Sequence, residues 1–454
     1  MQNDDLLILG IGISLKKNDG LLRFEHFCKT HDLNYQIVGE GKEWRGGNLS
    51  VEAGGGQKIN ELIACLENLS DNKLLVICDT FDVIPLAGYQ EIVDKFNMIC
   101  GENNILVASE KICWPDAKLA SSYPQVNTKY KYLNSGTFIG YRNVIYDILK
   151  DSNISDTDDD QLLLTNKFLS GERIILDYKC ELFQAMYKCD EDLIVHKNRV
   201  FNKYTNTYPV FIHGNGPAKF FLNSVENYLF SNTINHSYTC KKINSLKFEP
   251  KVFIALYIDS NNISNLKLFM SHVSNINYKN KEIYLYDKSN NEQIEKLFKL
   301  TYPNFKKGVL SYCFDDFKQS DCEYYFLLEQ NCLITNKNIL HELIPMCNDY
   351  HRVLSPMLRN LSNTSSTNFW GKLTSGGYYE RSNDYLDIAN YNLRGLWNVP
   401  YVYGAILMHK SIITDWDLSF DKYNGDRDMN LCFNLRKHTI FIYSININEY
   451  GHLA

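Results

Sequence analysis

The chain has 454 residues, of which 44% are hydrophobic and 22% charged, proportions that are ordinary for a globular protein. This length exceeds one hydrophobic core of usual size and predicts two or three domains. The formal net charge of -6 argues against a nucleic-acid partner, and no apolar run is long enough for a transmembrane segment.

The N-terminus carries acids where a signal peptide has a basic segment, and its apolar run is short. The 13 cysteines are scattered and form no CxxC pair. An odd number of cysteines without an export signal is typical of reduced thiols. We therefore expect no signal peptide and a cytoplasmic location.

Strand-like and helix-like segments alternate along the first half of the chain. Segment 57–69 repeats apolar residues on one helical face. Apolar runs bounded by turns are typical of strands that are covered on both faces. They occupy 6–13, 35–41, 74–80, 105–110, 137–141 and 209–216. This alternation predicts an α/β fold with a mostly parallel sheet.

A polar stretch at 231–250 predicts a linker, and the pattern restarts after it. Further strands are expected at 251–260, 282–287, 323–331, 352–358 and 438–445. We predict an α/β chain of two tandem Rossmann-like domains, with boundaries 1–240 and 241–454. Both halves open on an apolar strand, which is consistent with a duplicated domain.

The stretch LLVICDTFDV (74–83) ends a strand on two aspartates, Asp79 and Asp82. Ligands of parallel α/β sheets bind beyond the carboxyl ends of the strands. Two close carboxylates repel each other unless a cation or a proton lies between them, and carboxylate oxygens favour Mg²⁺ or Mn²⁺. An aspartate-rich turn that caps a helix explains these two residues equally well.

Two further stretches favour the metal interpretation. Gly54, Gly55 and Gly56 precede the amphipathic segment, where backbone amides and Lys58 could approach a phosphate. A flexible surface turn is the plain alternative. In FIHGNGPAK (211–219), a strand ends on His213, whose imidazole beside two carboxylates suits Mn²⁺ better than Mg²⁺. Together these stretches predict one site for a nucleoside-diphosphate sugar, with the metal as Lewis acid.

The order of several motifs then resembles one known family. WRGG, GGGQK, DTFD, ASEKICWPD, LNSGTFIGY, DDDQLLLT and HGNGPAK occur in sequence. They resemble the glycosyltransferase domain of the multifunctional procollagen lysyl hydroxylases and their giant-virus relatives. STNFWGKLTSGGYYERSNDYLDI and GLWNVPYVYGAILM resemble that family's accessory domain. The resemblance implies two GT-A-type domains, the first catalytic and the second noncatalytic, and Mn²⁺ as cofactor.

The resemblance also implies an activity and site residues. It implies transfer of glucose from UDP-glucose to galactosyl-hydroxylysine of collagen-like chains, with retention at the anomeric carbon. The implied metal ligands are Asp79, Asp82 and His213. Positions matching the family's donor-binding residues are Trp44, Leu49, Lys58, Phe81, Gly216 and Lys219, where Phe81 stands in place of the usual Tyr. Positions matching its acceptor-side and catalytic-pocket residues are Glu110, Trp114, Asn134, Asp159 and Asp160.

Alternatives stay open at this point. The chain could be a related UDP-sugar transferase, such as a hydroxylysine galactosyltransferase, or a noncatalytic scaffold that binds collagen-like chains. Trp114 could be an ordinary core tryptophan, and the acids at 158–160 a solvated loop. In the second half, Glu329, Gln330 and Asn331 end the central strand, and two amides are poor replacements for anionic metal ligands. We therefore expect the second domain to be a support without catalytic function.

Overall fold

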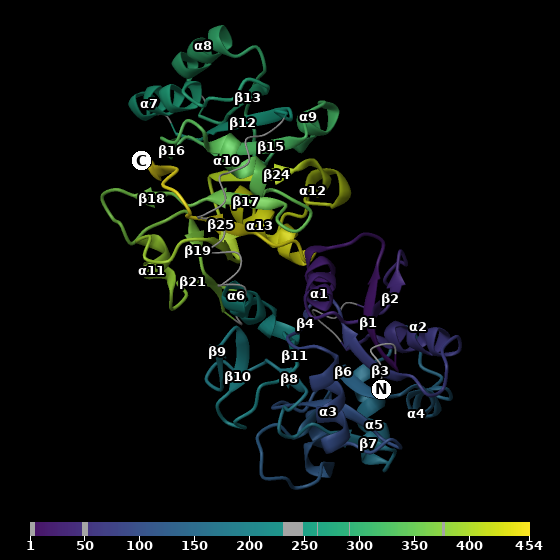
Figure 1. Ribbon diagram of the computed structural model, residues 1–454. Helices are drawn as coiled ribbons and strands as arrows, with labels where there is room; N and C mark the ends of the chain where they lie inside the picture. The colour runs from purple at the N-terminus through teal and green to yellow at the C-terminus, as the bar shows by residue number, and fades with distance from the viewer. Residues whose placement is uncertain (1–4, 48–52, 230–247, 261, 290, 375–376) are drawn as a thin grey trace. The chain divides into compact units, whose positions relative to one another are not determined.

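The computed structural model describes residues 5–47, 53–229, 248–260, 262–289, 291–374 and 377–454. The chain divides into two compact units, Met1–Val225 and Glu226–Ala454 (Figure 1). Each unit is built on its own α/β sheet, which confirms the predicted fold class of two tandem α/β domains. Most of the expected linker lies outside the described residues, and the expected roles of the two domains stay predictions.

The main sheet of the first unit has six strands in the order β2-β1-β3-β6-β5-β7. Strand β1 pairs in parallel with β2 and β3, whereas β6 runs antiparallel between β3 and β5. The strands are β1 (Leu6–Ser14), β2 (Tyr35–Glu40), β3 (Leu74–Asp79), β5 (Ile105–Glu110), β6 (Tyr132–Tyr141) and β7 (Ile174–Leu176).

Helices cover both faces of this sheet, as the continuous apolar runs predict. Along β3, Val76 packs with residues of α1 and α3, whereas Ile77 packs with residues of α2, α4 and α5. The helices are α1 (Asp19–Thr30), α2 (Gly56–Leu66), α3 (Tyr89–Ile99), α4 (Arg142–Leu149) and α5 (Asp160–Leu169), and a further helix, α6 (Lys219–Leu229), contains the division between the two units. The sheet therefore holds its strand ends rigidly between two helical layers.

One expected strand differs from the prediction. Only Phe211–His213 of the apolar run 209–216 forms a strand, β11, and it pairs with β4 (Val83–Pro85) and β8 (Phe183–Ala185) in a separate sheet. The strand ends at His213 because the chain then turns into the short 3-10 helix Gly216–Ala218, where proline cannot donate to a ladder. Two further strands, β9 (Leu193–His196) and β10 (Arg199–Asn202), form a hairpin.

The second unit has an eight-stranded sheet in the order β14-β13-β12-β15-β24-β17-β25-β22. Its strands are β12 (Val252–Ile258), β13 (Lys281–Asp287), β14 (Phe305–Lys307), β15 (Tyr324–Glu329), β17 (Val353–Pro356), β22 (Leu396–Asn398), β24 (Ala405–His409) and β25 (Tyr443–Ile445). Its helices are α7 (Ile263–Ser274), α8 (Glu292–Thr301), α9 (Phe314–Gln319), α10 (Ile339–Met346), α11 (Tyr385–Ala389), α12 (Lys410–Asp415) and α13 (Arg427–Lys437).

Short strands complete the second unit in one three-stranded sheet, β16-β26-β18, and two two-stranded sheets, β19-β23 and β20-β21. They are β16 (Cys332–Ile334), β18 (Arg359–Asn360), β19 (Phe369–Trp370), β20 (Lys372–Leu373), β21 (Tyr379–Glu380), β23 (Tyr401–Val402) and β26 (Gly451–Leu453). The strand expected at 438–445 begins only at Tyr443. The preceding residues close helix α13, because His438 caps it and Thr439 takes a left-handed conformation with φ of 56°.

The two sheets repeat one topology. The order β2-β1-β3-β6-β5 of the first unit recurs as β13-β12-β15-β24-β17 in the second, with the fourth strand antiparallel in both. In this alignment, Asp79 and Glu329 each end the third strand, opposite Ile11 and Tyr257 respectively. None of the helices in the described ranges combines the length and hydropathy that a bilayer crossing requires.

Candidate active site

Three side chains converge beyond the carboxyl end of β3. Asp79 is the last residue of this strand, Asp82 follows in the turn before β4, and His213 ends β11. One ligand atom from each lies within 4.8 Å of the others. His213 Nε2 is 3.5 Å from Asp82 Oδ1 and 4.0 Å from Asp79 Oδ2. The three residues proposed from the sequence as metal ligands therefore form one cluster.

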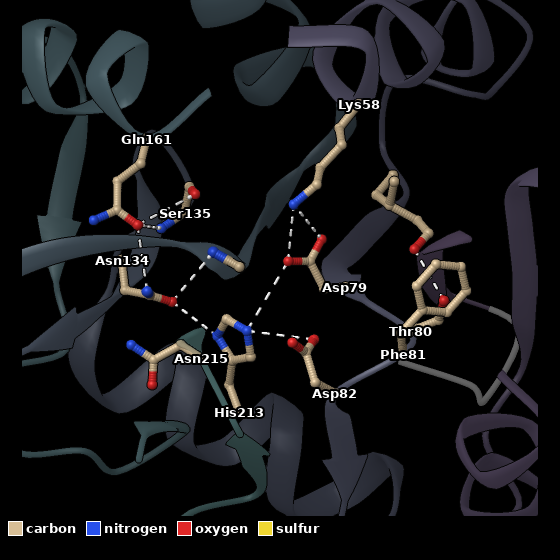
Figure 2. Close-up of polar contacts among 12 residues, drawn as sticks. Lys58, Asp79, Thr80, Phe81, Asp82, Asn134, Ser135, Gln161, His213 and Asn215 are labelled. Atoms are coloured by element: carbon tan, nitrogen blue, oxygen red, sulfur yellow. Dashed lines mark hydrogen bonds and ion pairs between the residues drawn. The ribbon is translucent and has the colours of Figure 1, made fainter. Parts of the chain in front are cut away.

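A hydrogen bond fixes the orientation of the His213 ring. Its Nδ1 lies 3.0 Å from Asn134 Oδ1, so Nδ1 carries the proton and Nε2 points towards the two carboxylates (Figure 2). Gly136 makes room for the ring, since a Cβ there would lie 2.1 Å from His213 Cε1. The motif LNSG thus supplies both an acceptor and a space for the imidazole.

Two lysines flank the carboxylates. Lys58 Nζ is 2.9 Å from Asp79 Oδ1 and 3.7 Å from Asp160 Oδ2, whereas Lys219 Nζ is 3.1 Å from Asp82 Oδ2. Burial alone would lower the pKa of Lys58, but Asp160 and Asp79 outweigh it and raise that pKa. Half of the Lys219 side chain is exposed, so it can turn towards a ligand.

The two aspartates differ in their electrostatic surroundings. Burial raises the pKa of Asp79 above its usual range, and Lys58 opposes this effect only in part. At Asp82 burial acts in the same direction, but Lys219 and His213 outweigh it and lower the pKa of that carboxyl. Lys58 and Lys219 thus offset the negative charge of this carboxylate pair.

Glu110, at the end of β5, is buried and held by three side-chain amides. Its Oε1 accepts hydrogen bonds from Gln161 at 2.8 Å and Asn134 at 3.1 Å, and its Oε2 accepts one from Asn215 at 3.0 Å. Burial raises the pKa of Glu110, while these amides oppose that change. The same network links Asn134, the partner of His213, to Glu110, which the sequence predicts on the acceptor side.

Asp159 and Asp160 have different roles. Asp159 is the N-cap of α5, where its Oδ1 accepts a hydrogen bond from the Leu162 amide at 2.6 Å. Asp160 points towards Lys58 and accepts a hydrogen bond from the Ser135 hydroxyl at 3.1 Å. The structure therefore gives Asp159 a structural contact and places only Asp160 beside the lysine of the carboxylate cluster.

The glycines before α2 do not form the expected phosphate cradle. The amides of Gly55 and Gly56 donate to the carbonyls of Gly46 and Asp158, at 2.9 and 2.7 Å. A Cβ on Gly56 would lie 2.0 Å from the Ser155 carbonyl, so glycine is needed for close packing of the backbone. The expectation that these amides bind phosphate is wrong, because both already donate hydrogen bonds to backbone carbonyls.

The aromatic positions lie as follows. Trp114 has 53% of its surface exposed, so the alternative of a core tryptophan is wrong. Trp44 is half-buried, and its indole NH donates to the Gly47 carbonyl at 2.6 Å. Phe81 lies between the two aspartates in the turn after β3, with its carbonyl held by Arg23. Leu49 lies outside the described residues.

Gly216, which is also predicted to lie at the donor site, differs from the glycines at 54–56. Gly216 is exposed, has a φ of 56°, and has no neighbouring atom within 4 Å of a Cβ position. It begins the 3-10 helix that leads to Lys219. The backbone here is open to a ligand beside Asp82, so the predicted diphosphate position fits this segment better than it fits residues 54–56.

Sequence reasoning missed part of the network. Asn215 joins Glu110 to the Tyr187 amide, and Ser135 joins Asp160 to Gln161. Both residues lie inside motifs that were recognised, HGNG and LNSG, but short polar residues in turns usually serve local hydrogen bonds. Only the pairing of β5 with β6, which the sequence does not show, brings Asn134 next to Glu110.

Comparison with known proteins identifies the family. Residues 2–240 match the family model described as the PLOD GT domain, which covers more than half of the chain. The chain belongs to the PLOD GT-domain family and is a glycosyltransferase. Residues 290–454 match a second family, the N-terminal domain of glycosyltransferase family 25. The resemblance to procollagen lysyl hydroxylase/glycosyltransferases is thereby confirmed, and both units match glycosyltransferase families.

Relatives of this PLOD GT-domain protein match over nearly its whole length. An uncharacterized protein of Acanthamoeba polyphaga mimivirus is 59% identical, over 100% of this chain and 99% of the relative. Procollagen-lysine,2-oxoglutarate 5-dioxygenase 2 of Mus musculus is 32% identical, over 99% of this chain. The multifunctional procollagen lysine hydroxylase and glycosyltransferase LH3 of Homo sapiens is 30% identical, over 98%. The chain spans 65% of the length of each of these two animal relatives.

Proposed function

We propose that this protein is a Mn²⁺-dependent retaining glucosyltransferase that moves glucose from UDP-glucose to galactosyl-hydroxylysine in collagen-like chains. The observation that carries the proposal is the cluster of Asp79, Asp82 and His213, with their ligand atoms within 4.8 Å of one another. Family membership supports the sugar transfer, and the names of the animal relatives support a collagen-like acceptor.

The donor set fits a manganese ion. Two carboxylates and one neutral imidazole combine hard oxygen ligands with a nitrogen that Mn²⁺ tolerates better than Mg²⁺. Asn134 accepts the hydrogen bond from His213 Nδ1, so the ring directs Nε2 at Asp79 and Asp82. Bound there, the ion supplies Lewis-acid stabilisation of negative charge on the departing nucleoside diphosphate.

The lysines act on the same charge. With a cation held by Asp79 and Asp82, Lys58 and Lys219 would lose part of their pairing with these carboxylates and could bind diphosphate oxygens. Lys58 then also remains beside Asp160, which holds it close to the sheet edge. Gly216 leaves an open backbone next to Lys219, where a phosphate can approach without meeting a side chain. Trp44 and Phe81 would frame the uridine, and Leu49 remains a candidate there.

Glu110, Asp160 and Trp114 would complete the pocket on the sugar and acceptor side. Glycosyl transfer develops positive charge at the anomeric carbon, which nearby carboxylates stabilise. Glu110 is held rigidly by three amides, and Asp160 by Lys58 and Ser135. Such fixed groups need no reorganisation during the reaction. Asp159 would act indirectly, since it caps the helix that begins with Asp160.

The experiment is a donor and acceptor screen on the purified full chain. UDP release is measured from UDP-glucose and UDP-galactose, with Mn²⁺ or with EDTA, on galactosylated and on bare hydroxylysine peptides. We expect release only with UDP-glucose, Mn²⁺ and the galactosylated peptide, and a disaccharide product of retained anomeric configuration by NMR. Release with UDP-galactose on the bare peptide would instead make the protein a hydroxylysine galactosyltransferase.

We propose further that residues 1–240 are the catalytic domain and residues 241–454 a noncatalytic support. The described part of the second unit contains no cluster of three side chains arranged like Asp79, Asp82 and His213. A cytoplasmic location and the absence of a nucleic-acid partner belong to the same proposal. No UDP release from any donor by the full-length Asp79→Ala, Asp82→Ala variant would support this division of labour.

A further inference from the structure

The second unit has a polar cavity at the sheet edge that corresponds to the active site of the first. Its volume is about 340 Å³, and it lies beyond the ends of β12 and β15 and beside the start of α7. Asp259 and Ser260 line it just after β12, Glu329 lines it from the end of β15, Gln330 and Asn331 from the turn that follows, and Asn265 from α7. Ligands of α/β sheets bind at such carboxyl edges, and ligand pockets begin at about 300 Å³.

An internal guanidinium neutralises the carboxylates of this edge. Arg427, the first residue of α13, pairs with Asp259 and with Glu329, whose Oε1 lies 3.3 Å from Arg427 Nη2. Only 8% of the Arg427 side chain is exposed, and its guanidinium lies over the Tyr257 ring at 4.7 Å. The guanidinium of Arg427 is therefore fixed within the fold and is not free to move towards a ligand.

The surroundings of Glu329 do not suit a metal ion or a nucleoside diphosphate. Cys332 stands three residues after Glu329, where the first unit has Asp82 three residues after Asp79. The cavity lining contains no lysine or arginine among the described residues. A diphosphate would meet the carboxylates of Asp259 and Glu329 without a mobile cation to offset its charge.

The side chains that line the cavity can form hydrogen bonds with uncharged groups of a ligand. Carboxylates accept hydrogen bonds, whereas asparagine amides both donate and accept, and this combination matches the hydroxyls of a sugar. Asn265 and Asn331 are exposed, and their side-chain nitrogens have no hydrogen-bond partner within the described ranges. Gln330, in contrast, is buried and bonded to the Ser260 amide and the Asn262 carbonyl, which stiffens the floor.

We propose that the second unit binds an uncharged saccharide in this cavity, and that the binding needs no metal ion. Arg427 supplies the charge balance that a divalent cation would supply in the first unit. A glycosylated acceptor carries several saccharides, so a second saccharide site raises the effective concentration of the acceptor on the enzyme. This consequence rests on the proposed function, whereas the binding itself does not.

The test is saturation-transfer-difference NMR on the full chain with millimolar methyl β-D-galactopyranoside or methyl α-D-glucopyranoside, in the presence of EDTA. We expect transfer signals that persist in the variant Asp79→Ala, Asp82→Ala. They should fall severalfold in the double variant Asn265→Ala, Asn331→Ala, and also when Asn265→Trp fills the cavity. The matched control is Asn275→Ala, at the other end of α7, where the signals should not change.

Three results would overturn the proposal. Signals that need Mn²⁺, or that vanish in the Asp79→Ala, Asp82→Ala variant, would place the sugar in the first unit. Signals that persist in both cavity variants would exclude the second unit as the binding site. Absence of signal from both sugars would exclude a saccharide. UDP release, measured separately with Mn²⁺, UDP-glucose and a peptide that carries one galactosyl-hydroxylysine, reports on the proposed function independently of this binding.

Discussion

The two units of this chain differ in how they neutralise the carboxylates at the ends of their third strands. Each places a carboxylate at the end of its third strand, Asp79 in one and Glu329 in the other, at equivalent register positions. In the first, a second aspartate and an imidazole join it and leave a gap for a cation. In the second, the side chain of Arg427 fills that role permanently.

The difference shows how few residues separate a catalytic sheet edge from a structural one. Topology and strand register are shared, but Asp82 corresponds to Cys332, and among the described residues no lysine lines the second cavity as Lys58 lies beside Asp79 in the first unit. A shared fold therefore sets where a ligand can bind, and individual side chains decide which ligand.

The largest expected effect comes from breaking the metal cluster. Asp79→Asn should lower Mn²⁺-dependent UDP release by about 10³-fold, because metal stabilisation of the leaving group contributes several kcal/mol. The matched change at the corresponding position, Glu329→Gln, should leave UDP release unchanged. Similar losses in both variants would show that the two sheet edges are not functionally distinct.

The next effect is on stability. At about pH 9, where Glu329 is ionised, Arg427→Met leaves Glu329 and Asp259 without their cation and should lower the free energy of unfolding by about 3 kcal/mol, as when one partner of a buried ion pair is removed. Denaturant unfolding of the full chain measures this. The control is Arg394→Met, an exposed arginine of the same unit, which should change little. Equal effects would mean that Arg427 is not the internal cation of this site.

A third change sharpens the role of His213. Asn134→Leu removes the acceptor for His213 Nδ1 and should raise the Mn²⁺ concentration for half-maximal activity by about 10–100-fold, the usual cost of losing such a partner. Ser135→Ala, on the neighbouring residue without contact to His213, should leave the Mn²⁺ requirement near the wild-type value. An unchanged requirement in Asn134→Leu would remove Asn134 from the metal site.

The fourth prediction concerns pH. Burial and the carboxylate of Asp428 raise the pKa of Glu329 to about 8 despite Arg427, and burial raises the pKa of Asp428 to about 6. The folded state thus keeps the Glu329 proton to a higher pH than the unfolded state does. Its stabilising contribution is full below the unfolded pKa of about 4.5 and is lost as pH rises to about 8.

Chemical unfolding of the wild type and Glu329→Gln across this range measures the contribution. The free energy of unfolding of the wild type, relative to that of the variant, should fall steadily from about pH 5 to about pH 8. A parallel pH dependence of the two proteins would contradict the raised pKa of Glu329. UDP release is not needed for this measurement, so it reports on the second sheet edge separately from catalysis.

The smallest expected effect separates two tryptophans. Trp114 is 53% exposed in the first unit and Trp397 is 2% exposed in the second. Trp114→Ala should lower transfer about tenfold, as loss of roughly 1.4 kcal/mol of contact would, and should change stability by less than about 0.5 kcal/mol. Trp397→Ala should cost about 3–5 kcal/mol of stability. Equal losses of stability in Trp114→Ala and Trp397→Ala would show that Trp114 is a core residue.

Much of this site follows from local sequence patterns. Strands β1, β2, β3 and β5 follow directly from apolar runs, and the polar residues after β3 predict a ligand site at Asp79 and Asp82, because ligands of α/β sheets bind beyond the carboxyl ends of the strands. His213 ends β11 in a separate sheet, and it reaches the two aspartates through the pairing of β11 with β4, which that rule does not give. Boundaries were less accurate where a helix end overrides an apolar run, as at Thr439.

Contacts that depend on tertiary pairing could not be predicted. The bond between Asn134 and His213 joins residues 79 positions apart, and the pair Arg427 and Glu329 joins residues 98 apart. The glycines at 54–56 led to a phosphate site being predicted where the backbone instead packs against a loop. A glycine-rich helix start has the same sequence pattern in both cases.

The most direct test is the anomalous diffraction of manganese in crystals of the full chain grown or soaked with Mn²⁺ and UDP. The account predicts one strong peak, within coordination distance of Asp79, Asp82 and His213, and none between Asp259 and Glu329. A peak beside Glu329, or no peak at the three residues of the first unit, would contradict it.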